Sequence, residues 1–414
     1  MKFKRLFIAA AVTAGTLVGA QAQSAYSMFG YGTLNDNATS SQVAMGGVGY
    51  AMRSGRQINV MNPASYAAID SLTFLFDIGV DLTKIKAKDA DATSSTTGGG
   101  LQYVNIQFPL GKYMGASVGM LPFSTVQYSF GDEIVNGHSA YQGSGGINQA
   151  YVGVAGRPVK GLTVGFNFSY MFGTLLNDIY GYGSTTGTGT LWEKTMEVRD
   201  WRLQLGAQYG LKIGSKHQAT VGLTYAPGKD LAGHAWATRY DINASSSTEP
   251  EREGYTSLRH KYSLPDTWGV GVNYEWNERL MAEFDATYQN WDKAKYASID
   301  TEDSNIKFAN RYKYAFGVQY RHSQRANYLQ RINWRAGAFT SRDYVTIQGN
   351  HINEYGLSCG LGLPTPAGNK TMLNLTFQYV HREGSPAKLI SENHFNISLG
   401  ININELWFMP AKLR

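Results

Sequence analysis

The stretch that most constrains the fold is residues 267–289, where apolar and polar side chains alternate strictly on both sides of a three-residue turn. The polar face of this stretch carries Gly, Asn, Glu, Asp, Thr and Gln. The apolar face carries Trp268, Val270, Val272, Tyr274 and Trp276, then Leu280, Ala282, Phe284, Ala286 and Tyr288. A period of two predicts a β-hairpin. An apolar face with aromatics near both ends and a polar opposite face suits a transmembrane barrel, although one hairpin does not exclude a soluble sheet with one wet face.

Repetition of this pattern favours the barrel. Alternating runs recur over 72–82, 102–110, 113–130, 148–157, 162–172, 201–209, 217–242, 312–320, 332–340, 355–363, 373–379 and 395–401. We therefore predict an all-β transmembrane antiparallel barrel of about 14 strands over residues 71–408, followed by a short tail, 409–414. If the segments 217–243 and 255–276 are each two strands, the number is sixteen, and both numbers are even, as in bacterial barrels. The stretches 131–147, 174–195 and 244–254 are rich in Gly, Ser, Thr or charged residues, and we expect them to be polar loops.

The first 22 residues have the pattern of a secretory signal peptide. Lys2, Lys4 and Arg5 precede an apolar run, 6–18, and Ala20-Gln21-Ala22 is a small-x-small cleavage site. No later run of about 18 apolar residues could cross a membrane as a helix. The sequence thus predicts export to the outer membrane of a Gram-negative cell.

Residues 23–70 precede the first clean alternation. Gly46 and Gly47, and then the turn Asn62-Pro63-Ala64, interrupt any long strand or helix. A segment of mixed apolar and turn character in front of a barrel fits best in the lumen. We predict that it is a plug segment.

A proline interrupts one of the expected wall strands. Pro122, followed by Phe123, lies within 113–130, and proline cannot donate a ladder hydrogen bond. Two interpretations remain open: an ordinary bulge near the rim, or a local gap that opens the lumen sideways to the bilayer.

No catalytic residue, cofactor or metal site is predicted, and we expect no enzyme. The histidines lack metal-ligand spacing, the chain has one Cys, and nucleotide-binding and nucleophile-elbow motifs are absent. Glu283 and Asp285 share a strand face; we interpret them as lumen charges balanced by Arg or Lys of neighbouring strands, with acid–base chemistry as the alternative. Without Lys2, Lys4 and Arg5 the chain has 34 basic and 31 acidic residues, which argues against nucleic acid as a partner.

Several of these stretches together resemble the FadL-like family of outer-membrane transporters for long-chain fatty acids and other hydrophobic compounds. The matching pieces are Ala44-Met45-Gly46-Gly47-Val48-Gly49, Asn62-Pro63-Ala64, Pro122-Phe123, LPDTWGVGVNYEW (264–276) with the hairpin that follows, and NEYGLSCGLGLP (353–364) with NELWF (404–408). The resemblance implies a fourteen-stranded barrel, a plug anchored by Asn62, Pro63 and Ala64, and a lateral opening at Pro122 and Phe123.

Three functions follow as hypotheses. The first is uptake of hydrophobic, fatty-acid-like molecules through a plugged lumen with lateral exit into outer-membrane lipids. The second is a structural subunit of a secretion or outer-membrane assembly complex, because the expected loops are more polar than a surface that captures fatty acids. The third is a porin for polar solutes, which requires the plug to leave. Expected partners are outer-membrane lipids, a hydrophobic ligand, the barrel-assembly machinery during biogenesis and other envelope proteins.

Overall fold

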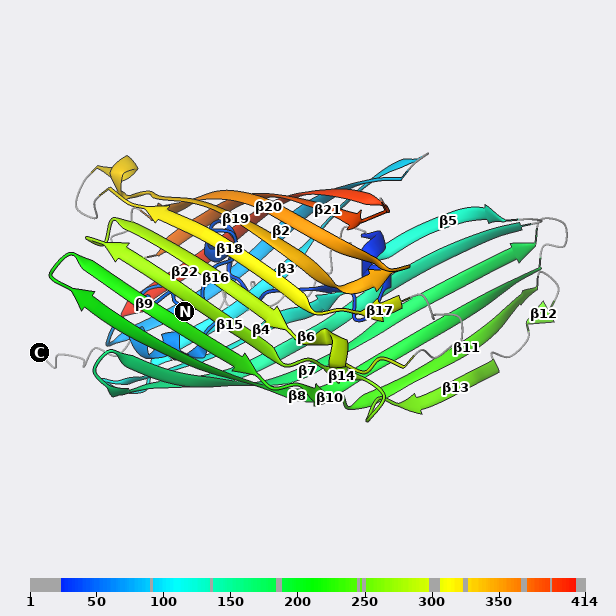
Figure 1. Ribbon diagram of the computed structural model, residues 1–414, viewed down its shortest axis with the longest axis horizontal. Coiled ribbons are helices and arrows are strands. Elements are labelled where there is room, and N and C mark those ends of the chain that lie inside the picture. Colours follow the sequence, from blue (N-terminus) through cyan, green and yellow to red (C-terminus); the bar gives the residue numbers. More distant parts are fainter. Residues whose placement is uncertain are drawn as a thin grey trace, which may run out of the picture.

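The chain forms a closed antiparallel barrel of 14 strands in the computed structural model (Figure 1). The structure describes residues 24–89, 92–134, 137–183, 188–243, 246–247, 251–297, 306–322, 327–365, 371–387 and 389–406; the predicted signal peptide and C-terminal tail lie outside these ranges. The wall strands are β2 (Thr73–Lys88), β3 (Thr93–Pro109), β4 (Met114–Thr125), β6 (Gly137–Val159), β7 (Leu162–Gly183), β8 (Thr188–Ile213), β9 (His217–Ala226), β15 (Thr267–Trp276), β16 (Leu280–Gln289), β18 (Arg311–Tyr320), β19 (Asn333–Ile347), β20 (Asn350–Pro364), β21 (Met372–Ser385) and β22 (Ser391–Leu406).

Pairing of the first and last wall strands closes the barrel. β2 and β22 are in register from Thr73 opposite Leu406 to Lys88 opposite Ser391. The turns 110–113, 160–161, 214–216 and 277–279 lie at one end, which we call the turn end, together with the longer connection 321–332. The connections that follow β9 and β16 and the tight turn 348–349 lie at the other, the loop end. The pairing of β2 with β22 satisfies the backbone groups of both strands along this seam, as a lipid environment requires. The predicted fold class is confirmed.

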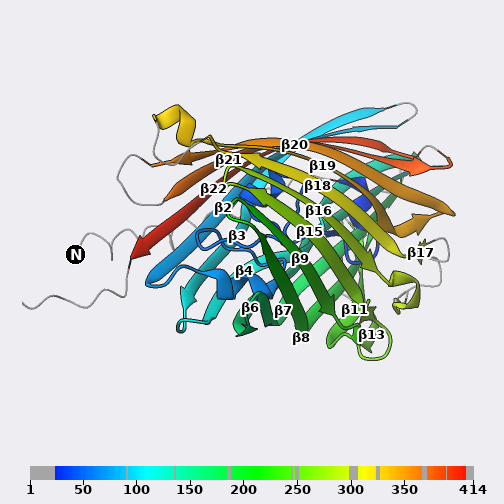
Figure 2. The ribbon, with the colours of Figure 1, turned by 60° about the vertical axis from the view of Figure 1, so that its left-hand side comes forward.

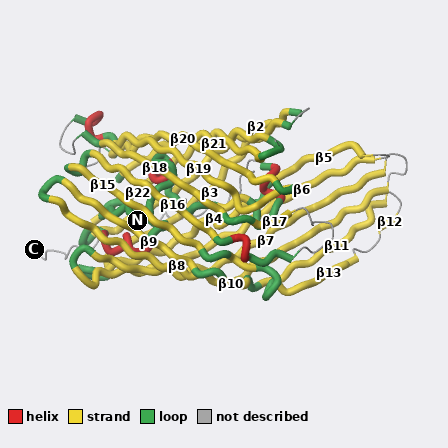
Figure 3. The backbone as a smooth tube through the Cα atoms, in the orientation of Figure 1, coloured by secondary structure: helices red, strands yellow, loops and turns green. Residues whose placement is uncertain are grey.

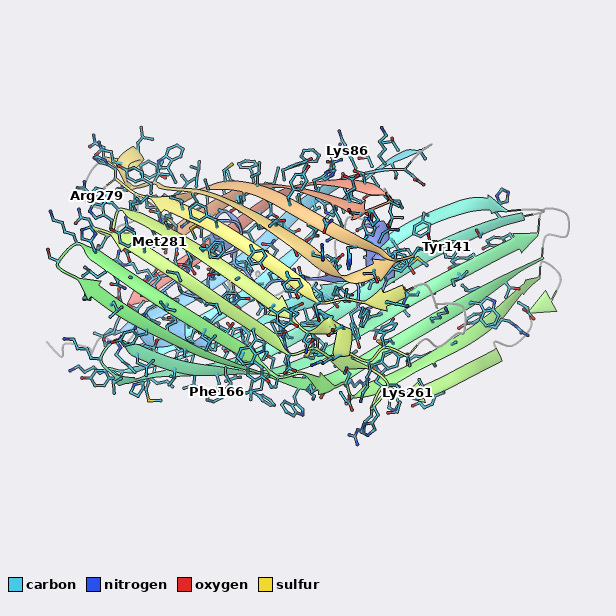
Figure 4. All side chains as sticks on the ribbon, viewed as in Figure 1. Lys86, Tyr141, Phe166, Lys261, Arg279 and Met281 are labelled. Carbon is cyan, nitrogen blue, oxygen red and sulfur yellow. The ribbon has the colours of Figure 1, made fainter. Side chains whose placement is uncertain are left out.

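The two faces of the wall differ as the alternation predicts. In β15 the apolar side chains Val270 and Val272 are exposed on the outside, whereas Asn273 is buried. The same division holds around the barrel, and Figure 4 shows Phe166 projecting from the outer surface. A continuous apolar exterior around a polar interior is the surface of a transmembrane barrel.

Part of the sheet continues past the barrel at the loop end. β5 (Tyr128–Ile134), the far halves of β6, β7 and β8, β11 (Gly233–Asn243), β12 (Ser246–Ser247) and β13 (Glu251–Ser257) form an extension, seen at the right of Figure 1. The prediction that 131–147 and 174–195 are loops is wrong: their described residues pair residue by residue, from Gly137 opposite Gly183 to Gly173 opposite Ile147. Glycine and threonine disfavour an isolated strand only weakly, and pairing on both sides outweighs that preference.

Residues 24–70 form a compact, buried segment inside the barrel, seen in dark blue in Figure 2. It contains the 3-10 helices η1 (Ala25–Met28) and η2 (Pro63–Ala68), the short strand β1 (Thr33–Leu34) and one helical turn, α2 (Ser40–Val43). The remaining elements are the hairpin of β10 (Lys229–Asp230) with β14 (Ser263–Leu264), η3 (Trp291–Lys293), β17 (Ile306–Phe308) and η4 (Tyr328–Arg331).

Helices are few and short in Figure 3. Within the described ranges, no helix has the length and apolar character needed to span a membrane.

We predict that Val272→Arg destabilises the barrel by about 2–4 kcal/mol, because it places a cation on the lipid face between the two tryptophans of β15. Ile213→Arg at the turn end is the matched control, with an expected cost of about 0–1 kcal/mol because arginine there reaches the interface. Equilibrium unfolding in phospholipid vesicles measures both. Equal costs would contradict the assignment of the lipid face.

Candidate functional site in the barrel interior

Inward-facing glycines let the N-terminal segment approach the wall at backbone distance. A Cβ added at Gly222 would lie 1.9 Å from the carbonyl oxygen of Tyr50, and one at Gly115 would lie 2.1 Å from that of Tyr66. We call the set the glycine belt; it comprises Gly115, Gly153, Gly165, Gly206, Gly222, Gly269, Gly271, Gly317, Gly337, Gly360 and Gly400. Any larger residue at these positions would displace residues 40–66, so the belt fixes where the segment lies.

Glu283 and Asp285 bind the backbone of the same segment. Asp285 Oδ2 accepts hydrogen bonds from the amides of Gly49 (2.7 Å) and Tyr50 (3.0 Å), and Glu283 Oε1 accepts one from Ala51 (2.8 Å). Both carboxylates are buried, and Glu283 Oε2 accepts from Asn273 Nδ2 at 2.7 Å. In the described residues neither carboxylate contacts Arg or Lys closely enough for an ion pair, although the charge of Lys313 on the neighbouring strand β18 acts on Asp285. The expected counter-charge is thus present for Asp285 at a longer distance, and backbone amides are the direct partners of both side chains.

The turn at Asn62 stabilises the segment from within. Asn62 Nδ2 donates to the carbonyl of Tyr50 at 2.7 Å, and its Oδ1 accepts from the amide of Ala64 at 3.1 Å. Asn62 therefore caps η2, and Pro63 occupies the first helical position, where its missing N–H costs nothing. Asn62, Pro63 and Ala64 are all buried.

Gly46 and Gly47 make a sharp bend against the opposite wall. Their φ angles are +74° and +83°, a region that favours glycine. The amide of Gly46 donates to Ser358 Oγ at 2.9 Å. The five residues predicted for this segment thus lie in it, and each contributes to its path.

An ion-pair cluster joins the segment to β18. Asp36 contacts Arg311 at 3.1 Å and Lys313 at 2.5 Å, and both cations are more than 90% buried. Burial alone would raise the pKa of the Asp36 carboxyl, but the charges of Lys313 and Arg311 outweigh it and hold that pKa well below its ordinary value. Sequence reasoning missed this cluster because no spacing links residues 36 and 311.

Aromatic side chains fill the loop end of the lumen. Tyr31 is fully buried, and its ring packs against Trp291, Tyr296 and Phe308 at centroid distances of 5.8, 5.4 and 6.1 Å. Its amide donates to Tyr344 Oη at 2.9 Å. The segment therefore completes an aromatic core where an open channel would need an entrance.

Pro122 lies in β4 where that strand parts from β3. The β3–β4 ladder runs no further than Met120 opposite Val104, and the register against β6 shifts between Pro122 and Ser124. Beyond that point β1 of the N-terminal segment pairs with β4, and the amide of Asn35 donates to the carbonyl of Phe123 at 2.9 Å. The buried Phe123 ring faces the Arg202 guanidinium at 5.2 Å. The segment thus borders the place where we expected a lateral opening.

Three cavities are lined by described residues. The largest, about 680 Å³, opens at the turn end and is lined mainly by charged and polar side chains. The others, about 60 and 10 Å³, adjoin Asp36 and Tyr50. None of the three is an apolar channel of the roughly 300–1,000 Å³ that holds a drug-sized ligand. Among the described residues no group of His, Cys, Asp and Glu could hold a metal ion.

We predict that Asp36→Asn destabilises the folded protein by about 3 kcal/mol at pH 7, because it leaves two buried cations without a counter-charge. The folded-state pKa of Asp36 is lowered, so its contribution is present above the ordinary value of 3.8 and is lost as pH falls toward the folded value. The stability difference between wild type and variant should be constant above about pH 5 and shrink below about pH 4. Tryptophan-monitored unfolding in detergent across this pH range measures it; a difference independent of pH would contradict the ion-pair role.

We predict that Gly222→Ala prevents the N-terminal segment from seating, because its methyl group would overlap the Tyr50 carbonyl. Gly100→Ala in β3 is the matched control, since no atom lies within 4 Å of the added carbon. Limited proteolysis of the folded barrel should cleave residues 24–70 in the first variant and spare them in the control. Equal protection would show that the belt does not determine the fit.

Comparison with solved structures shows the FadL-like fold. The chain is similar to the toluene transporter TodX of Pseudomonas putida (14% identity, 91% of this chain and 100% of that chain, TM-score 0.64). It is also similar to a FadL homologue of Pseudomonas aeruginosa (10% identity, 91% and 99%, TM-score 0.64) and to the toluene transporter TbuX of Ralstonia pickettii (14% identity, 89% and 99%, TM-score 0.59). The fold that the sequence resemblance implied is thereby confirmed.

Sequence comparison gives a more specific assignment. No curated protein matches the chain significantly. The model of one family, BamG, matches residues 2–414, nearly the whole length. The chain belongs to the BamG family.

Proposed function

We propose that this protein is a non-enzymatic outer-membrane barrel that serves as a fixed subunit of an outer-membrane protein assembly complex. The observation that carries the proposal is the N-terminal segment, which lies inside the barrel and is bound through the glycine belt and the side chains of Glu283 and Asp285. A plug held in this way makes the barrel a rigid body with outer surfaces for partners.

The strength of this attachment argues against routine movement of the segment. Three backbone amides donate to buried carboxylates, and hydrogen bonds to charged groups contribute about 1.5–3 kcal/mol each. These bonds and the packing against the glycine belt both stabilise the seated state.

The family assignment supports the same role. The match to the BamG family model is consistent with involvement in barrel assembly. In this role the expected partners are other envelope proteins and outer-membrane lipids. The short turns face the periplasm and the strand extension faces outward, the usual asymmetry of such barrels.

Uptake of a hydrophobic compound is the second candidate, and one observation favours it. The β3–β4 ladder ends close to Pro122. Beyond that point, β1 of the N-terminal segment pairs with β4. If β1 left this place, a sideways exit would open beside Phe123. Two of the structures with a similar fold are toluene transporters.

The double variant Glu283→Gln, Asp285→Asn separates the two candidates, because it weakens the attachment of the segment without changing side-chain volume. For a fixed subunit, we expect wild type to co-purify from crosslinked native membranes with other assembly subunits at constant stoichiometry, and the double variant to lose part of that yield. Uptake of labelled toluene by whole cells should stay at the level of cells lacking the protein. For a transporter, loosening the segment should instead raise uptake.

Pro122→Val is the matched control for the lateral exit, because it restores a ladder donor without touching the segment's anchors. It should leave complex recovery unchanged. Recovery of wild type only as a monomer, together with toluene uptake that depends on the protein and falls with Pro122→Val, would overturn the assembly role.

A further inference from the structure

A charged vestibule opens at the turn end of the barrel, beneath the N-terminal segment. Its volume is about 680 Å³, and its walls come from the segment loop 52–57 and from the turns that follow β8, β15 and β18. Figure 4 shows Arg279 and Met281 at this end of the molecule, and both residues line the vestibule. The assembly role does not by itself explain why this space is left open while the rest of the lumen is filled.

Positive charge predominates in the vestibule. The cations are Arg53, Arg56, Lys212, Lys216, Arg279, Arg321 and Arg331, and the carboxylates are Asp70, Glu275 and Glu278. Asp70 contacts Arg56 at 3.7 Å. Arg53 and Arg321 instead donate to the backbone carbonyls of Gly161 and Glu278, which carry no net charge.

Two of these guanidinium groups lie near other cations. Burial lowers the pKa of Arg53 below its ordinary value, and the charge of Arg157 lowers it further. In the turn after β18, burial and then the charge of Arg56 lower the pKa of Arg321. Like charges held together in a partly enclosed space create a positive potential that attracts an anion.

The charge and the size of the vestibule identify the class of ligand. Guanidinium and ammonium groups recognise carboxylates, and the cations are spread over several turns, so that a chain with several carboxylates can contact more of them than a single small anion can. Lipid headgroups lie outside the wall, whereas the vestibule lies within the lumen, and its volume falls in the range of about 300–1,000 Å³ that holds a ligand of a few residues.

We propose that the turn-end vestibule binds an acidic peptide segment of a periplasmic partner protein, with its carboxylates on the arginines and lysines. The proposal deepens the assembly role and rests on it, because it names where and by what chemistry the barrel contacts a partner in the periplasm. The acidic peptide of the partner enters from the turn end. The N-terminal segment of the barrel protein covers the inner side of the peptide site.

Binding of a fluorescein-labelled hexaglutamate peptide to the purified full-length protein in nanodiscs tests the proposal. Fluorescence anisotropy should show saturable binding that weakens as salt screens the charges. The double reversal Lys216→Glu, Arg279→Glu should reduce affinity by about tenfold or more. Both side chains are exposed, so the fold should tolerate the change. Lys160→Glu, an exposed lysine of another turn at the same end, is the matched control and should leave affinity unchanged.

Two further measurements distinguish the possible outcomes. Inorganic phosphate at matched ionic strength should compete no better than chloride, and a hexaglutamine peptide should bind far more weakly than hexaglutamate. Absence of binding, an equal effect of the control and the double reversal, or full displacement by phosphate would each overturn the peptide site. Co-purification of assembly subunits with wild type is scored separately: if those subunits are recovered and hexaglutamate does not bind, the vestibule proposal fails and the assembly role stands.

Discussion

The contact between the N-terminal segment and the wall is the constraint on which the rest of the interior depends. A backbone can lie against a barrel wall only where the wall has no side chains, and the glycine belt provides that surface on strands from β4 round to β22. Carboxylates placed where the backbone amides of Gly49, Tyr50 and Ala51 point then satisfy donors that no strand or helix pairs. The segment is thus bound as an additional structural layer.

The two ends of the barrel differ in how they are filled. At the loop end the ring of Tyr31 completes an aromatic core, and Asp36 neutralises two buried cations of β18. At the turn end, the side chains that line the vestibule carry an excess of positive charge. An aromatic core at one end and a charged cavity at the other are consistent with the proposed contact with a partner. The strand extension adds surface at the loop end.

Much of the fold could be predicted from the sequence, because the side chains of a barrel strand alternate between apolar and polar with a period of two. Val270 and Val272 face lipid and Asn273 faces inward, as the period of two predicts. This alternation was not sufficient to predict two features of the structure. The stretches expected as loops at 131–147 and 174–195 form paired strands, because hydrogen bonding to neighbours on both sides outweighs the weak strand preference of Gly and Thr. The carboxylates of Glu283 and Asp285 were recognised as interior charges, but their partners are amides some 230 residues away, and no spacing rule connects them. The glycine belt could be detected in part from the sequence, because Gly269 and Gly271 occupy inward positions of a regular strand. Their positions do not indicate which part of the chain packs against them.

The sequence by itself determined the alternation of side chains, and therefore the all-β membrane barrel and the presence of a segment before it. Only the tertiary structure decided what the segment does to the lumen. Periodicity is local, because it depends on which way successive side chains point along one strand. The fit of Tyr50 against Gly222, the pairing of Asp36 with Arg311 and the gathering of cations at the turn end all depend on closure, which brings distant parts of the chain to within a few ångströms of one another.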